Sequence, residues 1–261
     1  MGMRKPAVAG AFYPADKKEL REMILGFIRY SRTVCIQGEL KALIVPHAGY
    51  IYSGVVAAAG YKLLKDSKYK KFLILGPSHY VPFMGASFSF DDYWSTPLGK
   101  VPVIKPEETE NLKSVPEAHI QEHSIETQLP FLQVVVKQFG ILPLILGYVN
   151  PKSLAKELIN YLDDETFIII SSDLSHYHTY EEARNIDSFS NKVIPSLDTN
   201  NAERIDACGS SGIQTVLHIA KQLGWKGVLI DYKNSGDTAG DKNHVVGYGC
   251  YGFYSETKRK G

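Results

Sequence analysis

Ionisable side chains follow four short apolar runs of the chain, at the points where these runs end. The runs and the residues that follow them are Ala42–Val45 with His47, Phe72–Leu75 with His79, Phe167–Ile170 with Asp173 and His176, and Val228–Ile230 with Asp237. Imidazole and carboxylate groups are poor choices for packing, but they serve well as metal ligands and as acid–base groups. The pattern therefore predicts metal binding or acid–base catalysis.

The elements that carry these groups are predicted from the apolar pattern. Each of the four runs is continuously apolar, which is typical of a strand buried on both faces of a parallel sheet. Amphipathic segments alternate with the strands, and they predict helices over 54–64, 124–139, 152–162, 181–197 and 211–223. The alternation predicts an α/β fold, with a largely parallel or mixed sheet covered by helices on both faces.

The carboxyl ends of parallel strands meet at one edge of a sheet, and ligands of open α/β sheets bind in the crevice beyond that edge. We therefore expect at least His47 and His79 to converge there. Each residue also has a purely structural interpretation. The histidines could make local hydrogen bonds in turns, Asp173 could cap the next helix, and Asp237 could form a turn.

Two imidazoles and a carboxylate suit a borderline divalent metal. A face of two histidines and one carboxylate with open positions is typical of non-haem Fe(II) sites. The same ligands can hold a catalytic Zn²⁺ with a bound water. The residues alone leave both metals open. In either case His176 would be free to act as acid or base, because the reference pKa of histidine lies near neutrality.

A second cluster lies between residues 117 and 126. His119 and His123 are four residues apart, and His123 and Glu126 are three apart, but the order of residues is not that of the HExxH zinc motif. We interpret His123 and Glu126 as part of the crevice wall, with an exposed helix surface as the alternative.

Cysteine usage argues against a disulfide framework. The chain has three cysteines, and none forms a CxxC pair, which fits a reducing cytoplasm. Cys208 precedes Gly209 at the start of a predicted helix, where a thiolate would be stabilised. We expect a buried or capping role for this cysteine, with a nucleophile as the alternative.

Composition excludes several classes of protein. The 261 residues are 44% hydrophobic and 22% charged, which is ordinary globular usage and excludes a disordered chain. The net charge of +1 argues against a nucleic-acid-binding protein, and the lack of a long apolar run argues against a membrane span. No secretory signal and no linker is evident, so we expect one cytoplasmic domain over residues 1–261.

With these motifs the chain resembles the Memo family, also called the AmmeMemoRadiSam system protein B family. The resemblance covers nearly the whole chain. Its motifs are Ala9–Pro14, Pro46–Gly54, Gly76–His79, Trp94–Gly99, Glu122–Glu126, Ser171–His176, Asn234–Thr238 and Val246–Tyr248. So many motifs in one order make the resemblance specific.

The resemblance implies a fold like that of the LigB-like class III extradiol dioxygenases, which are non-haem iron enzymes. It implies His47 and His79 as metal ligands and His176 as the acid–base group. The third ligand is expected in the loop Ser235–Thr238, and we expect it to be Asp237. Vertebrate members carry a cysteine at this point, where this chain has Thr238. Iron(II) is the metal expected first, with zinc and copper as alternatives.

Three functions are compatible with these features: a metal-dependent oxidoreductase, a zinc-dependent hydrolase, and a non-catalytic module that binds a peptide or small molecule. His123 is expected to assist His176 in catalysis. The residues expected to contact substrate are Tyr50, Trp94, Glu126, Asp173 and Thr238. The name of the prokaryotic branch implies an association with AMMECR1-like and radical-SAM proteins, but it specifies no reaction.

Overall fold

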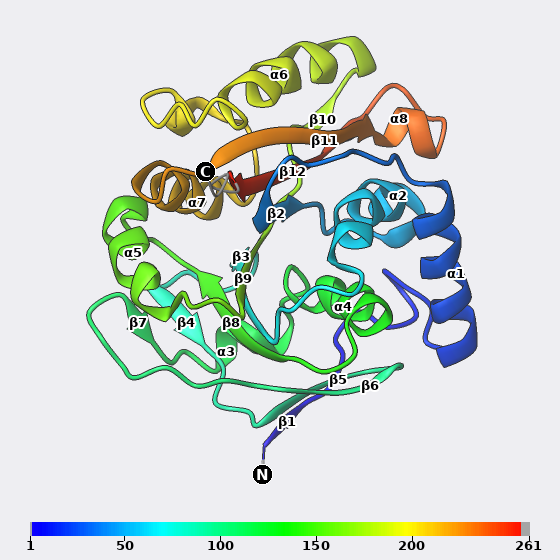
Figure 1. Ribbon diagram of the computed structural model, residues 1–261. Helices are drawn as coiled ribbons and strands as arrows, with labels where there is room; N and C mark the ends of the chain where they lie inside the picture. The colour runs from blue at the N-terminus through cyan, green and yellow to red at the C-terminus, as the bar shows by residue number, and fades with distance from the viewer. Residues whose placement is uncertain (1, 257–261) are drawn as a thin grey trace.

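A nine-stranded mixed sheet forms the centre of the protein in a computed structural model that describes residues 2–256 (Figure 1). Its strands lie in the order β10-β12-β2-β9-β3-β8-β4-β7, and β11 pairs with β12. The bounds are β2 Glu39–Val45, β3 Lys71–Pro77, β4 Ala86–Phe88, β7 Leu112–Lys113, β8 Gly140–Leu146, β9 Thr166–Ser171, β10 His176–His178, β11 Lys226–Asn234 and β12 Val245–Ser255.

The four apolar runs predicted as strands lie in β2, β3, β9 and β11. Strands β2, β9 and β3 are neighbours and pair in parallel. Strand β12 is antiparallel to both β2 and β11, so β11 runs in the same direction as β2. The carboxyl ends of all four runs therefore lie at the same edge of the sheet.

Helices cover both faces of the sheet. Figure 1 shows α1, α2 and α4 on one side and α5, α6 and α7 on the other. The bounds are α1 Lys17–Tyr30, α2 Tyr50–Tyr61, α3 Glu117–Ile120, α4 Leu129–Val135, α5 Pro151–Leu158, α6 Tyr180–Val193, α7 Ser210–Gln222 and α8 Ser235–Thr238. Two buried apolar clusters fill the two layers, and β2 contributes Leu43 to one and Ile44 to the other. The predicted single-domain α/β fold is confirmed.

One predicted element differs from the structure. The helix predicted over 124–139 is instead a 3₁₀ turn, Glu126–Gln128, followed by the seven-residue α4. The turn Ser95–Gly99 lies outside the main sheet. It joins β5 (Tyr93–Thr96) to β6 (Gly99–Pro102), which form a small sheet with β1 (Met3–Arg4). Strand β4 pairs with β8 in the main sheet.

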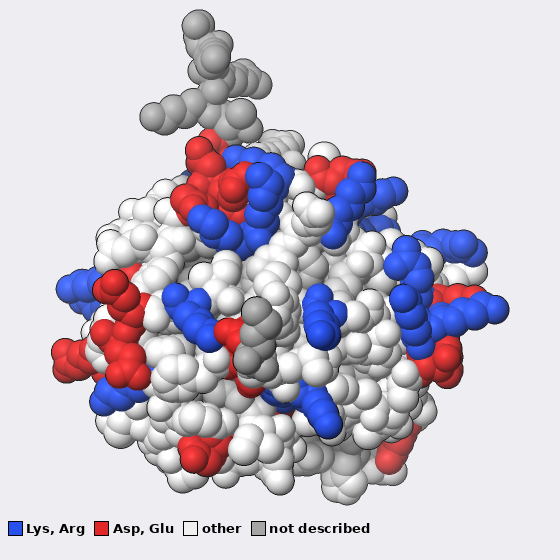
Figure 2. All heavy atoms as spheres, turned by 90° about the horizontal axis from the view of Figure 1, so that it is seen from below, with Lys and Arg blue, Asp and Glu red and all other residues white. Residues whose placement is uncertain are grey.

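Charges of both signs are intermixed on the face shown in Figure 2, with uncharged residues between them. A mixture of this kind is consistent with the small net charge of +1. Among the helices of residues 2–256, none combines the length and the apolar character that crossing a membrane requires.

The first helix supplies a test of local stability. Asp16 caps α1, because its Oδ1 accepts hydrogen bonds from the backbone N–H groups of Lys18 (2.9 Å) and Glu19 (2.8 Å). We predict that Asp16→Ala lowers the free energy of unfolding by about 1 kcal/mol, since two N–H groups lose their acceptor. Urea denaturation measures the loss. Lys18→Ala is the control, because this side chain is exposed, and an equal loss in the two variants would contradict the capping role.

Candidate metal centre

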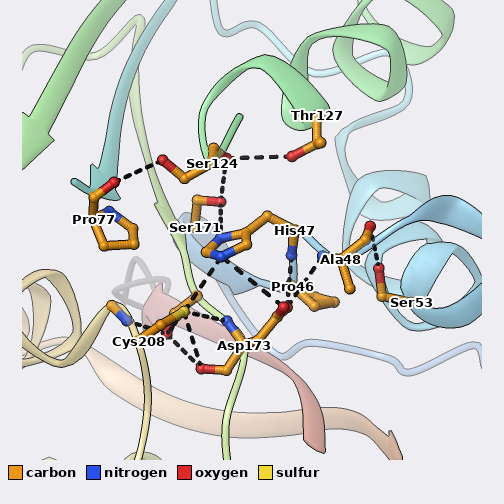
Figure 3. Close-up of polar contacts among 12 residues, drawn as sticks. Pro46, His47, Ala48, Ser53, Pro77, Ser124, Thr127, Ser171, Asp173 and Cys208 are labelled. Carbon is orange, nitrogen blue, oxygen red and sulfur yellow. Dashed lines mark hydrogen bonds and ion pairs between the residues drawn. The ribbon is translucent and has the colours of Figure 1, made fainter. Parts of the chain in front are cut away.

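His47 lies two residues past the end of β2, and its side chain is buried. Its Nδ1 lies 2.9 Å from Ser171 Oγ (Figure 3). That hydroxyl donates its one hydrogen to the carbonyl of Ser124, and it accepts a bond from Gln128 Nε2. The Gln128 amide is oriented by Pro46, whose carbonyl accepts from the same Nε2. Nδ1 of His47 must therefore be the donor, which leaves Nε2 with a free lone pair.

His79 lies two residues past the end of β3, and Glu122 fixes its orientation. Glu122 Oε1 is 3.0 Å from His79 Nδ1, and Oε2 accepts the backbone N–H of His79 at 2.7 Å. Burial would raise the pKa of Glu122, but hydrogen bonds from His79 and Ser124 outweigh it and lower the pKa to about 2. An ionised carboxylate can only accept, so His79 Nδ1 donates and Nε2 is free for a metal.

Cys208 supplies the third donor atom. Its Sγ lies 3.3 Å from His47 Nε2, and the rings of His47 and His79 are 5.2 Å apart between centroids. One donor atom from each of these three residues lies within 4.8 Å of the others. Tetrahedral bonds of about 2.3 Å to sulfur and about 2.0 Å to nitrogen place the two ligand atoms about 3.5 Å apart, so the donors fit one ion.

The thiol of Cys208 is protonated in the metal-free protein. Burial, together with the charge of Asp173, raises its pKa to about 12. A bound cation reverses this preference, because a thiol that coordinates a metal ion loses its proton. Two neutral imidazoles and one thiol that ionises on binding are a chemically complete ligand set.

The structure does not bring Asp237 to the two imidazoles. Its Oδ1 accepts from the hydroxyl of Tyr180 at 2.7 Å, and its Oδ2 accepts from the backbone N–H of Asn234 at 2.9 Å. The second bond belongs to the capping box of α8, which turns the carboxylate back onto its own helix. Thr238 likewise bonds within α8, to the carbonyl of Ser235. The donor atom that lies beside both imidazoles is instead the sulfur of Cys208, from a different loop.

A cavity of about 790 Å³ opens beside the three donors. Its lining consists of histidines, aromatic rings, two aspartates and small residues: Ala11, Phe12, His47, Ala48, Gly49, Tyr52, His79, His123, Asp173, His176, Tyr177, Cys208, Ser235, Ala239, Asp241, His244, Val246 and Tyr248. The expected acid–base residue His176 thus shares one cavity with His47 and His79. It enters on β10, where the next residue, Tyr177, has a left-handed backbone (φ 61°) of the kind found at functional sites.

His123 and Asp173 also face this cavity. The His123 ring stacks on His79, with 4.7 Å between centroids. Burial and the neighbouring His47 lower the pKa of His123 to about 4, so the ring is neutral at pH 7. Asp173 lies two residues past the end of β9, and its Oδ1 accepts from the backbone N–H groups of His47 (2.8 Å) and Ala48 (3.3 Å). Burial raises the pKa of Asp173.

Four of the five residues expected to contact substrate do not line the cavity. One is Thr238, which bonds within α8, and the other three are buried. Tyr50 is buried and donates its hydroxyl to the carbonyl of Thr127 at 2.6 Å. Trp94 is fully buried, and its indole N–H donates to Ser89 Oγ. Glu126 is fully buried and bonds to the N-terminal part of the chain. Tyr50, Trp94 and Glu126 therefore pack behind the residues of the cavity wall and do not face the cavity itself.

Comparison with known proteins gives the family. A family model described as "Memo-like protein" matches residues 4–251. The chain belongs to the Memo-like family. A MEMO1 family protein of Aquifex aeolicus is 38% identical, with 95% of this chain and 98% of the relative covered. MEMO1 family proteins of Thermoplasma volcanium and Thermoplasma acidophilum are 36% and 34% identical, each with 94% of this chain and 96% of the relative covered.

The low pKa of Glu122 predicts how stability depends on pH. A carboxyl group whose pKa is lower in the folded protein stabilises the fold above its ordinary pKa of 4.5, and this contribution is lost as the pH falls toward 2. The shift corresponds to roughly 3 kcal/mol. We predict that Glu122→Gln removes this part of the acid dependence, as measured by urea unfolding of the metal-free protein between pH 6 and pH 3.

The exposed Asp92 also has a lowered pKa, through Lys105, so Asp92→Asn is a control that should change the profile little. If Glu122→Gln loses stability on acidification as steeply as the parent, the carboxylate is not held as described.

Proposed function

We propose that the protein is a metal-dependent oxidoreductase whose ion is held by His47, His79 and Cys208. The observation that carries the proposal is the convergence of three donor atoms at the wall of the 790 Å³ cavity, two of them on imidazoles with a fixed tautomer. Iron(II) is the ion we propose first. Imidazole ligands suit it, and the cavity leaves room for further ligands on the ion.

A bound iron(II) would supply one-electron and oxygen chemistry. The residues of this chain would position the substrate and move protons. His176 lies in the same cavity and is free of the ligand set, so it is the group we propose for proton transfer. His123 stacks on His79 in the same cavity and is the group we propose to assist His176. The rings of Phe12, Tyr52 and Tyr248 line the cavity and would offer apolar contacts to a substrate.

A zinc-dependent hydrolase is the second candidate, and Cys208 is the observation that favours it. A thiolate is softer than a carboxylate, and sites with cysteine and histidine ligands commonly hold zinc or copper. Zinc would lower the pKa of a bound water to about 7. Metal analysis of protein purified without oxygen separates iron from zinc and copper. A folded protein that binds none of them would favour a module that binds a peptide or small molecule.

The ligand set is tested by substitution. We predict that His47→Ala, His79→Ala and Cys208→Ser each weaken Zn²⁺ or anaerobic Fe²⁺ binding by more than about 100-fold, since the loss of a ligand costs more than a change in its surroundings. Calorimetric titration measures the affinity, and circular dichroism verifies the fold. Asp237→Ala is the matched control and should bind as the parent does. The assignment would be wrong if Asp237→Ala lost the metal while Cys208→Ser retained it.

His176 is expected to act without binding the ion. We predict that His176→Ala keeps metal affinity within about tenfold of the parent, because the three donors remain. Turnover of any substrate identified should fall by about 10²–10⁴, the usual contribution of general acid–base catalysis. The same titration and a rate measurement test both parts. Loss of the metal on this single change would make His176 a ligand.

A further inference from the structure

A buried ion pair joins two segments of the chain that pack behind the candidate metal centre. We define the N-terminal arm as residues 4–13 and the support segment as residues 117–128. Arg4 Nη1 of the arm lies 2.7 Å from Glu126 Oε2 of the support segment, and the side chains are 4% and 0% exposed. A pair this deeply buried is costly to desolvate unless further hydrogen bonds satisfy both groups.

The guanidinium of Arg4 also donates hydrogen bonds to two backbone carbonyls of the support segment. Its Nε donates to the carbonyl of His119 at 2.6 Å, and its Nη2 donates to the carbonyl of Glu122 itself at 2.5 Å. The group also lies over the ring of Trp94, 4.2 Å from the centroid. Arginine can bond in several directions at once because its donors form a rigid planar fork.

Both carboxylate oxygens of Glu126 also accept hydrogen bonds from the N-terminal arm. Oε2 also accepts from the backbone N–H of Ala7 (2.7 Å), and Oε1 accepts from the N–H of Val8 (3.0 Å) and from the hydroxyl of Tyr13 (2.6 Å). With Arg4 this makes four donors on two oxygens, so the carboxylate is saturated. It has no acceptor site left for a substrate.

Both halves of this arrangement reach the candidate metal centre. The support segment presents the carboxylate of Glu122, which accepts the Nδ1–H and the backbone N–H of His79. The arm presents Phe12, whose ring lies 4.7 Å from that of His123 and lines the cavity. Neither Arg4 nor Glu126 lines the cavity.

We propose that Arg4 and Glu126 are positioning residues of the metal centre. They fix Glu122 against His79, and Phe12 against His123, so that the Nε2 lone pair of His79 points at the ion. The effect on metal affinity rests on the proposed function, whereas the effect on the orientation of His79 does not. A side chain that orients a ligand in this way is typically worth 10–100-fold in metal affinity.

The experiment compares Arg4→Met, Arg4→Lys and Glu126→Gln in the full chain. Glu126→Gln is nearly isosteric and keeps a folded variant available if Arg4→Met does not fold. The probe is Co²⁺, whose absorption band with a thiolate ligand reports binding at Cys208. Leu158→Ala is the control for a general loss of stability, since Leu158 is a fully buried residue of α5 packed on the opposite face of the sheet.

We expect Arg4→Met and Glu126→Gln to weaken Co²⁺ binding 10–100-fold. We expect Arg4→Lys to recover part of the loss, because the lysine keeps the charge but not the fork, and Leu158→Ala to bind as the parent does. The second readout needs no metal. It is hydrogen exchange at the backbone amide of His79, which donates to Glu122, and it should quicken in the first two variants more than in the control.

The two readouts separate the possible failures. If the parent binds no Co²⁺ through Cys208, the proposed ligand set fails, and exchange at His79 alone decides the positioning role. If the parent binds Co²⁺ and both Arg4→Met and Glu126→Gln bind it equally well, or if His79 exchanges in them no faster than in Leu158→Ala, the positioning role is overturned.

Discussion

The parallel pairing of β2, β9 and β3 is the constraint on which the site depends. Hydrogen bonds between parallel strands place their carboxyl ends at one edge. His47, His79 and Asp173 each lie two residues past the end of a strand, so each turn delivers a polar group to the same place. The strands themselves are buried on both faces, which leaves little freedom for a shift in register. A slip in any one pairing would separate the ligands.

Burial determines the protonation state and the tautomer of the side chains that follow the strands. Away from water, a polar group is held by the few partners that the fold provides. Ser171 has one hydroxyl hydrogen and Glu122 has none to give, so both imidazoles present an unprotonated Nε2 toward Cys208. The low pKa values of His47 (about 3) and His123 (about 4) have burial as their largest cause. Neutral imidazoles are the form that binds metal ions.

The sequence predicted the sheet and the convergence of His47 and His79 because both depend on local signals. Short apolar runs followed by His47 and His79 need only the rule that parallel strands end together. Cys208 was not predicted as a donor, since it follows no strand. It comes from the loop before α7, which reaches the site because the N–H of Gly209 bonds to Ser172 Oγ past the end of β9. Its only local signal was a cysteine at a helix start.

The residues expected to contact substrate show the same limit of prediction from sequence. Trp94 and Glu126 lie close to the site motifs in sequence, but sequence does not tell on which side of the support segment a side chain lies. Their roles follow from Arg4, about 90 and 122 residues away along the chain, which lies between them. Contacts of this kind are tertiary, and they override any interpretation of a motif by itself.

The protonated thiol of Cys208 has a consequence for the choice of ion. Because Cys208 carries its proton in the metal-free protein, a cation that this sulfur is to coordinate would have to displace that proton. Mg²⁺ and Ca²⁺ prefer oxygen ligands and gain little from sulfur, so they cannot drive this exchange, whereas ions with an affinity for thiolate can. With the proposed ligand set, Mg²⁺ and Ca²⁺ would therefore be disfavoured by the proton on sulfur as well as by their preference for oxygen ligands.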